Sequence, residues 1–144
     1  MTAADLNPDE ILASMLDGKV EVQTSETERH PIRCYADGKM PNKGLDDEFL
    51  TVEWNGSVQS RTFPPGCFKG ELALTLYCKT QTDGTVKRNR IRQILRQCQI
   101  LGSGTAAEGY RFNTDPSRTI MPTATDTKTG YSMTAIGVEW RTTS

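Results

Sequence analysis

The sequence predicts an α+β fold, in which a mixed, mainly antiparallel β-sheet carries a short N-terminal helix and one long helix packed on the sheet. Three segments of the sequence predict this fold. Residues 70–79 alternate between two faces, with leucines on one of them. Residues 85–101 space their apolar side chains as a helix does. Residues 131–140 alternate again and give a second strong strand close to the C-terminus.

A short helix of about three turns is expected near the N-terminus. Asn7 can cap it, Pro8 suits the first helical position, and Glu10 stands where a capping box has an acid. Gly18 is the expected stop. The apolar residues that fall on one face of this helix are Ile11, Leu12, Met15 and Leu16.

Two shorter strands are expected between this helix and residue 70. Residues 31–36 begin with a proline, which is tolerated at the first position of a strand, and residues 49–54 form the second strand. Asn55 and Gly56 follow directly, and Asn-Gly is the strongest short-range signal for a β-hairpin. Residues 58–62 are therefore expected to return beside residues 49–54.

The whole chain, residues 1–144, is expected to form a single domain, because 144 residues is an ordinary domain length. Residues 102–130 carry the weakest pattern and are rich in Gly, Thr, Asp and Pro. Strand character is confined there to residues 110–112 and 119–121. The segment as a whole is expected to be a long polar loop region.

The composition predicts a modest core. The hydrophobic fraction is 35% and the mean hydropathy is −0.54, while Thr, Ser, Gly, Asp and Asn fill much of the remainder. A protein of this kind can gain part of its stability from neighbours in an assembly. The charges are segregated, with acids in residues 5–28 and 46–53 and bases in residues 87–96. That distribution would let copies of the chain meet head to tail.

The cysteines and the histidine predict neither a metal site nor a disulfide framework. The four cysteines contain no CxxC pair, and the single histidine, His30, cannot build a site with Cys34 alone. We expect reduced cysteines that serve mainly as packing residues. The segment MTAADLNPDE has neither the basic nor the apolar region of a signal peptide, and no apolar run reaches the ~20 residues that span a membrane.

The sequence does not predict an enzyme. No nucleophile motif flanks His30, which is expected to be a surface residue. The three adjacent carboxylates at 46–48 lack a glycine-based calcium loop and are expected to be a solvated turn. Gly102 and Gly104 follow a helix and do not open one, so they indicate a helix end and not a phosphate loop. We therefore expect no catalytic residue, metal or cofactor, with a small hydrolase or a metal-dependent enzyme as the remote alternative.

The basic residues of the predicted long helix have three interpretations. Its apolar stripe could pack on the sheet while the charged face meets water, a neighbouring subunit or nucleic-acid phosphates. The apolar stripe of this helix is Ile91, Ile94 or Leu95, Cys98 and Leu101. In the core we expect contacts of Leu72, Leu74, Leu76 and Cys78 with Ile91, Leu95 and Cys98. The net charge of −1 argues against DNA as an independent partner. We favour a subunit interface, and its candidate residues are Arg88, Arg92, Arg96, Asp46, Asp47, Glu48 and Trp54.

Two tryptophans end similar strands, in the segments TVEWNG and GVEWRT. Trp54 and Trp140 are expected to be core or half-buried packing residues. The alternative is an anchor at a subunit interface, where tryptophan is enriched. Trp54 is therefore also a candidate interface residue.

The order of these segments resembles the tail-terminator and related neck proteins of bacteriophages with long tails. In that family a short helix precedes a sheet, a strong strand leads through a polar turn into a long helix, and a strand closes the chain. The matching segments here are PDEILASML, FLTVEWNG, GELALTLYCKTQTDGTVKRNRIRQIL and GYSMTAIGVEWRTT. Residues 102–130 have no counterpart in this resemblance.

The resemblance implies a virion structural protein. A tail terminator would form a ring, a hexamer, that caps the tail tube and joins the tail to the head connector or neck protein, with DNA passing through its lumen without specific binding. It would be assembled in the host cytoplasm and located in the tail and neck of the virion. The alternatives are a head-completion, tail-completion or tube protein, or a small nucleic-acid-binding module that uses residues 87–96.

Overall fold

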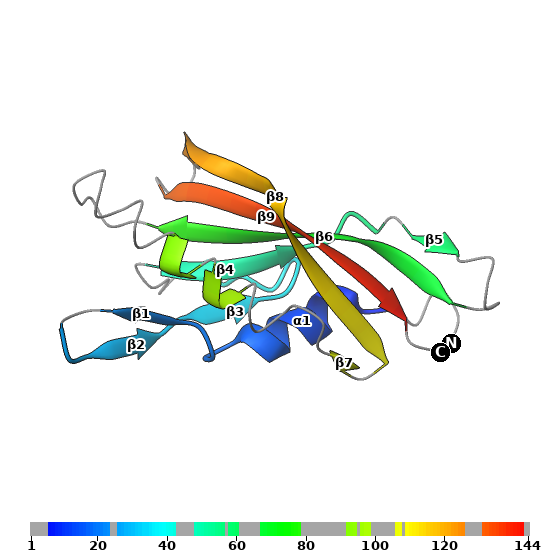
Figure 1. Cartoon of the computed structure of the whole chain (residues 1–144), viewed down its shortest axis with the longest axis horizontal. Coiled ribbons are helices and arrows are strands. Elements are labelled where there is room, and N and C mark those ends of the chain that lie inside the picture. Colours follow the sequence, from blue (N-terminus) through cyan, green and yellow to red (C-terminus); the bar gives the residue numbers. More distant parts are fainter. Residues whose placement is uncertain are drawn as a thin grey trace.

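The computed structural model describes residues 6–23, 26–42, 48–56, 58–60, 67–78, 92–94, 96–98, 106–107, 109–125 and 131–142. The described chain is mostly β (Figure 1). Its elements are α1 (Pro8–Leu16), β1 (Glu21–Gln23), β2 (Arg29–Pro31), β3 (Arg33–Tyr35), β4 (Glu48–Glu53), β5 (Gln59–Ser60), β6 (Phe68–Cys78), β7 (Ala106–Ala107), β8 (Tyr110–Thr125) and β9 (Ser132–Thr142).

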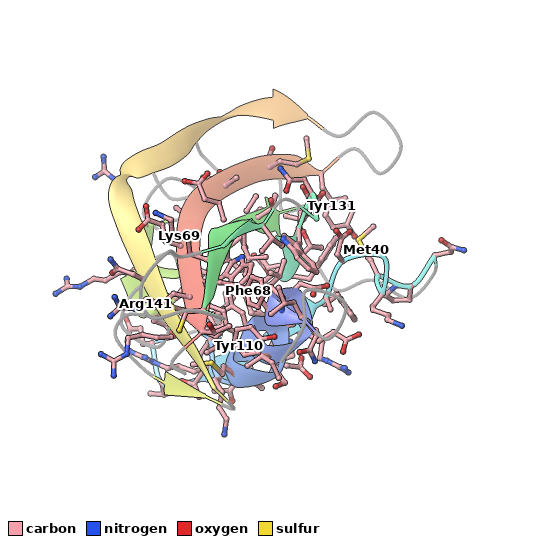
Figure 2. All side chains as sticks on the ribbon, turned by 90° about the vertical axis from the view of Figure 1, so that its right-hand side faces the viewer. Met40, Phe68, Lys69, Tyr110, Tyr131 and Arg141 are labelled. Atoms are coloured by element: carbon pink, nitrogen blue, oxygen red, sulfur yellow. The ribbon has the colours of Figure 1, made fainter. Side chains whose placement is uncertain are left out.

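The main sheet has seven strands in the order β3-β4-β6-β9-β8-β7, with β5 also paired to β6. The β3–β4 pair is parallel, and the other pairs are antiparallel. This sheet curls into a half-barrel, and α1 lies against its inner face (Figure 2). β1 and β2 form a separate two-stranded hairpin, which extends from one end of the molecule (Figure 1).

The α+β prediction is wrong, because no long helix packs on the sheet within the described residues. Outside α1, the described helical residues are 92–94 and 96–98. Ile94 and Cys98 are buried in the core, at 1% and 0% exposure. The apolar spacing therefore identified a buried face, but local periodicity does not determine how far a helix extends. Ile91, Leu95 and the predicted start of the helix lie outside the described residues.

The main core lies between α1 and the inner face of the sheet. α1 contributes Leu12 and Leu16, which are 1% and 0% exposed. Burial of one such side chain stabilises a fold by about 1.5–3 kcal/mol. The alternation predicted for the two strongest strands is present, and its inward-facing core residues are Leu72, Leu74 and Leu76 on β6 and Ile136, Val138 and Trp140 on β9. Cys78 is also buried, but it is not part of this cluster.

A second, aromatic cluster covers part of the sheet. Phe49 and Tyr77 are direct cross-strand partners, and their rings stack with centroids 4.8 Å apart and planes 5° apart. Tyr131 packs on Phe49 at 5.3 Å. Met40 and Met133 lie partly buried against these rings. Stacked aromatic pairs contribute about 0.5–1.5 kcal/mol to stability beyond the burial of their surface. This cluster therefore stabilises the pairing of β4 with β6.

The prediction of a long polar loop region over 102–130 is wrong for much of its length. β8 runs from Tyr110 to Thr125 and pairs with β9, with register shifts between Asp115 and Ile120 and between Ile120 and Ala124. These irregularities interrupt the alternation from which a strand is predicted. The strand also contains two prolines, at 116 and 122, which suit bulges and strands near a sheet edge.

Two local predictions also differ from the structure. The predicted 58–62 partner of 49–54 is wrong, because β5 pairs with β6 and not with β4. Gly56 does adopt a positive φ of 79°, but residues 59–60 pair with β6. Asn7 precedes α1 without a side-chain cap. Its backbone N–H donates to the Tyr110 hydroxyl at 3.0 Å, and that hydroxyl donates to Asn7 Oδ1 at 3.2 Å, which ties α1 to β8.

Candidate functional site

The candidate interface residues from the sequence do not gather at one place in the described structure. Arg92 and Arg96 are exposed on the helical segment. Arg88, Asp46 and Asp47 lie outside the described residues. Glu48 begins β4 and is 6% exposed, with Oε1 3.9 Å from the Cys78 thiol. A subunit contact through Glu48 would therefore require this carboxylate to become exposed.

Trp54 packs at the edge of the main core. It is partly buried, and its ring meets Trp140 edge to face with centroids 6.1 Å apart. Its backbone N–H donates to Asp37 Oδ2 at 3.0 Å. Trp140 is 1% exposed. These contacts agree with a packing role for both tryptophans, and an interface role for Trp54 stays a prediction.

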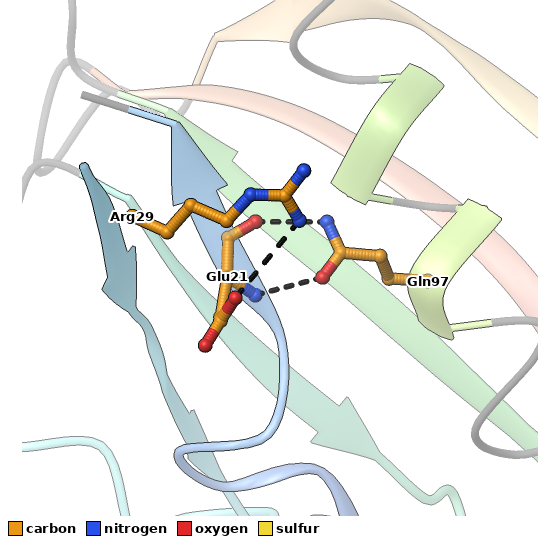
Figure 3. Close-up of polar contacts among 3 residues, drawn as sticks. All are labelled: Glu21, Arg29 and Gln97. Atoms are coloured by element: carbon orange, nitrogen blue, oxygen red, sulfur yellow. Dashed lines mark hydrogen bonds and ion pairs between the residues drawn. The ribbon is translucent and has the colours of Figure 1, made fainter. Parts of the chain in front are cut away.

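The β1–β2 hairpin contacts the rest of the protein through buried valines and through hydrogen bonds to Gln97. Val20 and Val22 are buried in the main core. The Glu21 N–H donates to Gln97 Oε1 at 2.9 Å, and Gln97 Nε2 donates to the Glu21 carbonyl at 2.8 Å (Figure 3). The Gln97 amide thus satisfies both backbone groups of Glu21, as a neighbouring strand would. Nothing in the sequence around Gln97 points to this contact, which joins residues 76 positions apart.

The far part of the hairpin is exposed. β2 is exposed at each of its three positions, and so are Glu26 and Glu28 in the segment that leads into it. Arg29 pairs with Glu21 at 4.0 Å, so the hairpin offsets that cation internally. We call Glu26 and Glu28 the acidic tip.

A row of cations crosses the sheet at the opposite end of the molecule. Lys69 on β6 stands directly opposite Arg141 on β9, and Arg141 stands directly opposite Arg111 on β8. All three are exposed, and none has an ion pair among the described residues. Figure 2 looks at this end of the molecule, where Lys69 and Arg141 are labelled. We call these residues the cationic row.

The buried groups of the described structure include all four cysteines, as free thiols. Burial raises the pKa of Cys98 to about 12, and burial, followed by Cys98 and Asp17, raises the pKa of Cys34 further above its ordinary value. A nucleophilic cysteine needs a depressed pKa, so these two thiols are suited to packing. Within the described ranges, no group of three or more His, Cys, Asp or Glu residues could hold a metal ion.

Comparison with protein-family models and with curated proteins gives no match to this chain. Among the described helices, none is long and apolar enough to cross a membrane. The described structure has two charged surfaces, the acidic tip and the cationic row. The acidic tip contains residues from the acidic N-terminal region of the sequence. The cationic row assembles from three segments that are individually unremarkable in charge, and strand register is needed to find it.

Proposed function

We propose that this chain is a structural subunit of a long-tailed bacteriophage, a tail terminator that assembles into a ring, caps the tail tube and joins the tail to the head connector. The proposal begins from the order of sequence elements that resembles that family. The long helix does not contribute to it, so the resemblance depends on the N-terminal helix, the sheet and the closing strand. The structural observation that supports the proposal is the β1–β2 hairpin, which extends from one end of the molecule (Figure 1) and whose strand β2 is exposed.

A hairpin with one exposed strand favours an assembly role. A two-stranded hairpin has marginal stability by itself in water. Here the base is fastened through Val20, Val22 and Gln97, while β2 remains exposed. An element held at its base and exposed beyond it can contact a neighbouring subunit. When such a contact joins two different surfaces, it repeats from copy to copy and closes into a ring if its rotation closes.

Electron microscopy of particles that lack the protein tests this function. Loss of a terminator should give unjoined heads and tails of irregular length. Restoring the gene should restore joined tails of uniform length. Native mass spectrometry of the purified protein, alone and with tail tubes, should detect a closed ring. Uniform, joined tails in the absence of the protein would contradict the proposal.

A second candidate function is nucleic-acid binding through the helical segment. Arg92 and Arg96 are both exposed, four positions apart on that segment. A phosphate contact there would give an affinity for duplex DNA that falls with salt. Fluorescence anisotropy with labelled DNA should then show weaker binding when both arginines become alanine. Gln93→Ala, an exposed position on the same segment, is the matched control.

A further inference from the structure

We infer that the segment after β4 contains a site of covalent self-modification. At this site the backbone nitrogen of Gly56 attacks the side chain of Asn55, which loses ammonia and becomes aspartate or isoaspartate. The only reactant besides the chain is water, and the modification is independent of the proposed ring. Three features carry the site: the Asn-Gly pair itself, the exposure of both residues, and their position between two strands.

Asn55 and Gly56 lie outside regular secondary structure. β4 ends at Glu53 and β5 begins at Gln59, so the ladder between β4 and β6 stops before the pair. Both residues are exposed. A Cβ atom at position 56 would meet no heavy atom within 4 Å, apart from its chain neighbours. The backbone and the Asn55 side chain can therefore move here without displacing packed residues.

The missing side chain of Gly56 favours the attack. The nitrogen of residue 56 must approach the Cγ atom of residue 55, and a side chain on residue 56 would crowd this approach. Glycine also reaches backbone conformations that other residues avoid, and Gly56 adopts such a conformation, with φ 79°. In the whole sequence, Asn55 is the only asparagine that glycine follows. The reaction is therefore directed to this one asparagine.

The reaction does not require Asn55 to be without contacts. Asn55 takes part in an interaction with the rest of the protein. Exposed side chains nevertheless change rotamer within nanoseconds or less. Loss of ammonia from an amide is far slower than these rotations, so the side chain visits the geometry of attack many times before it reacts. Exposure thus decides whether the reaction can occur.

The bonds and protons of the reaction balance with water alone. The Gly56 nitrogen gives its proton to solvent and forms a bond to Asn55 Cγ. The Cγ–Nδ2 bond breaks, and Nδ2 takes up a proton and leaves as ammonia. Water then opens the resulting cyclic succinimide at either of its carbonyl carbons. Opening at Cγ gives aspartate, whereas opening at the backbone carbonyl carbon gives isoaspartate, in which the chain continues through Cγ.

Either product changes the surroundings of Trp54. The new carboxylate adds a negative charge close to the exposed Glu53 and to Asp37, whose Oδ2 accepts the Trp54 N–H at 3.0 Å. Isoaspartate also inserts a methylene group into the backbone directly after Trp54. The Trp54 ring packs edge to face on Trp140, with centroids 6.1 Å apart. The modification should therefore loosen this edge of the core.

Mass spectrometry of the folded protein, incubated at mildly alkaline pH, tests the site. Asn55 should gain the mass that corresponds to replacement of its amide by a carboxylate, and electron-transfer fragmentation should identify both aspartate and isoaspartate there. Asn42, which is exposed and precedes lysine, is the control within the same molecule and should remain an amide. Asn55→Gln should abolish the conversion, because its longer side chain must close a larger and less favourable ring.

Protein unfolded in guanidinium chloride is the reference for the effect of the fold. Conversion of Asn55 in the unfolded protein alone would overturn the inference, because the native structure would then protect the residue. Equal conversion of Asn42 and Asn55 would also overturn it, and aspartate without isoaspartate would exclude the succinimide. After incubation, the wild-type protein should melt at a lower temperature than Asn55→Gln treated in the same way. Equal melting after complete conversion would contradict the expected effect on Trp54.

Discussion

The indole ring of Trp140 lies against the backbone of Gly70, its direct partner across the β6–β9 pair. A Cβ atom at Gly70 would stand 2.8 Å from Cε2, Cζ2 and Nε1 of the indole. Trp140 is held there by edge contacts with Trp54 and Tyr110, at centroid distances of 6.1 and 5.9 Å. Trp140 is the largest buried side chain of the described core, and it can lie there because Gly70 has no side chain.

Gly70→Ala is therefore expected to destabilise the protein. The added methyl group must displace the indole or the strand, and such overpacking costs about 1–3 kcal/mol. Urea denaturation measures the loss. The same change in a Trp140→Leu background should cost much less, because the smaller side chain leaves room for the methyl group. Equal costs in both backgrounds would show that the contact with Trp140 is not responsible.

Two buried threonines on β9 are expected to respond in opposite ways to replacement by valine. Thr134 Oγ1 is buried without a hydrogen-bond partner in the described structure, whereas Thr142 Oγ1 accepts the Phe68 N–H at 2.9 Å. Thr134→Val should leave stability unchanged or raise it, because it removes an unsatisfied polar atom. Thr142→Val should lower stability by about 1–3 kcal/mol, because it leaves the Phe68 N–H without its acceptor.

Thermal denaturation of the two valine variants, side by side, gives a direct comparison of nearly isosteric changes on one strand. A loss of stability in Thr134→Val equal to that in Thr142→Val would contradict the assignment of their hydrogen bonds.

Strands with regular alternation were predictable, whereas their partners were not. The leucines at 72, 74 and 76 show their common face directly in the sequence, because successive strand residues point to opposite sides of a sheet. The pairing of β5 with β6 is not local, and the Asn-Gly turn at 55–56 gave the wrong partner. β8 was predicted only at residues 110–112 and 119–121, because its register shifts interrupt the alternation over a segment of polar residues.

The candidate site was less predictable than the fold. Acidic residues near Glu26 and Glu28 are visible in the sequence, but their exposure depends on the projection of the hairpin from the sheet. The cationic row combines Lys69 with residues 42 and 72 positions later in the sequence. No short motif contains it, because it exists only through the register of three strands. The basic run at 87–96 predicted a different set of cations, which includes none of the cationic row.

The Gln97 side chain is expected to control the opening of the β1–β2 hairpin. Gln97→Glu replaces the amide that donates to the Glu21 carbonyl with a carboxylate, so one hydrogen bond is lost and two acceptors face each other. The Glu21 N–H keeps an acceptor, but loss of the other bond favours opening of the hairpin. The Glu21 amide should therefore exchange its hydrogen faster, by about tenfold for each 1.4 kcal/mol lost from the closed state. Hydrogen exchange measured by NMR detects this change.

Gln93→Glu is the matched control for Gln97→Glu, because Gln93 is exposed on the same helical segment and receives the same charge. It should leave exchange at Glu21 unchanged. Faster exchange in both variants would indicate an effect of charge alone and would contradict a specific role for Gln97.

The buried thiols of Cys34 and Cys98 predict a loss of stability at alkaline pH. A thiol has an ordinary pKa of 9.0, and burial raises the pKa of Cys98 to about 12 and that of Cys34 in the same direction. Above pH 9 the unfolded chain releases thiol protons that the folded protein retains. The stabilising contribution is therefore complete below pH 9 and is lost as the pH rises through the folded-state pKa values.

Urea denaturation below pH 9 and at about pH 11 measures this dependence. The wild-type protein should lose stability between the two conditions. The Cys34→Ala, Cys98→Ala double variant should be less stable at neutral pH, because it leaves cavities in the core, but it should lose less on going to alkaline pH. Lysines and tyrosines titrate in the same range in both proteins. The difference between the two proteins in the stability lost on going to alkaline pH therefore reports the contribution of the thiols. An equal loss of stability in both proteins would show that the two cysteines do not cause the alkaline loss.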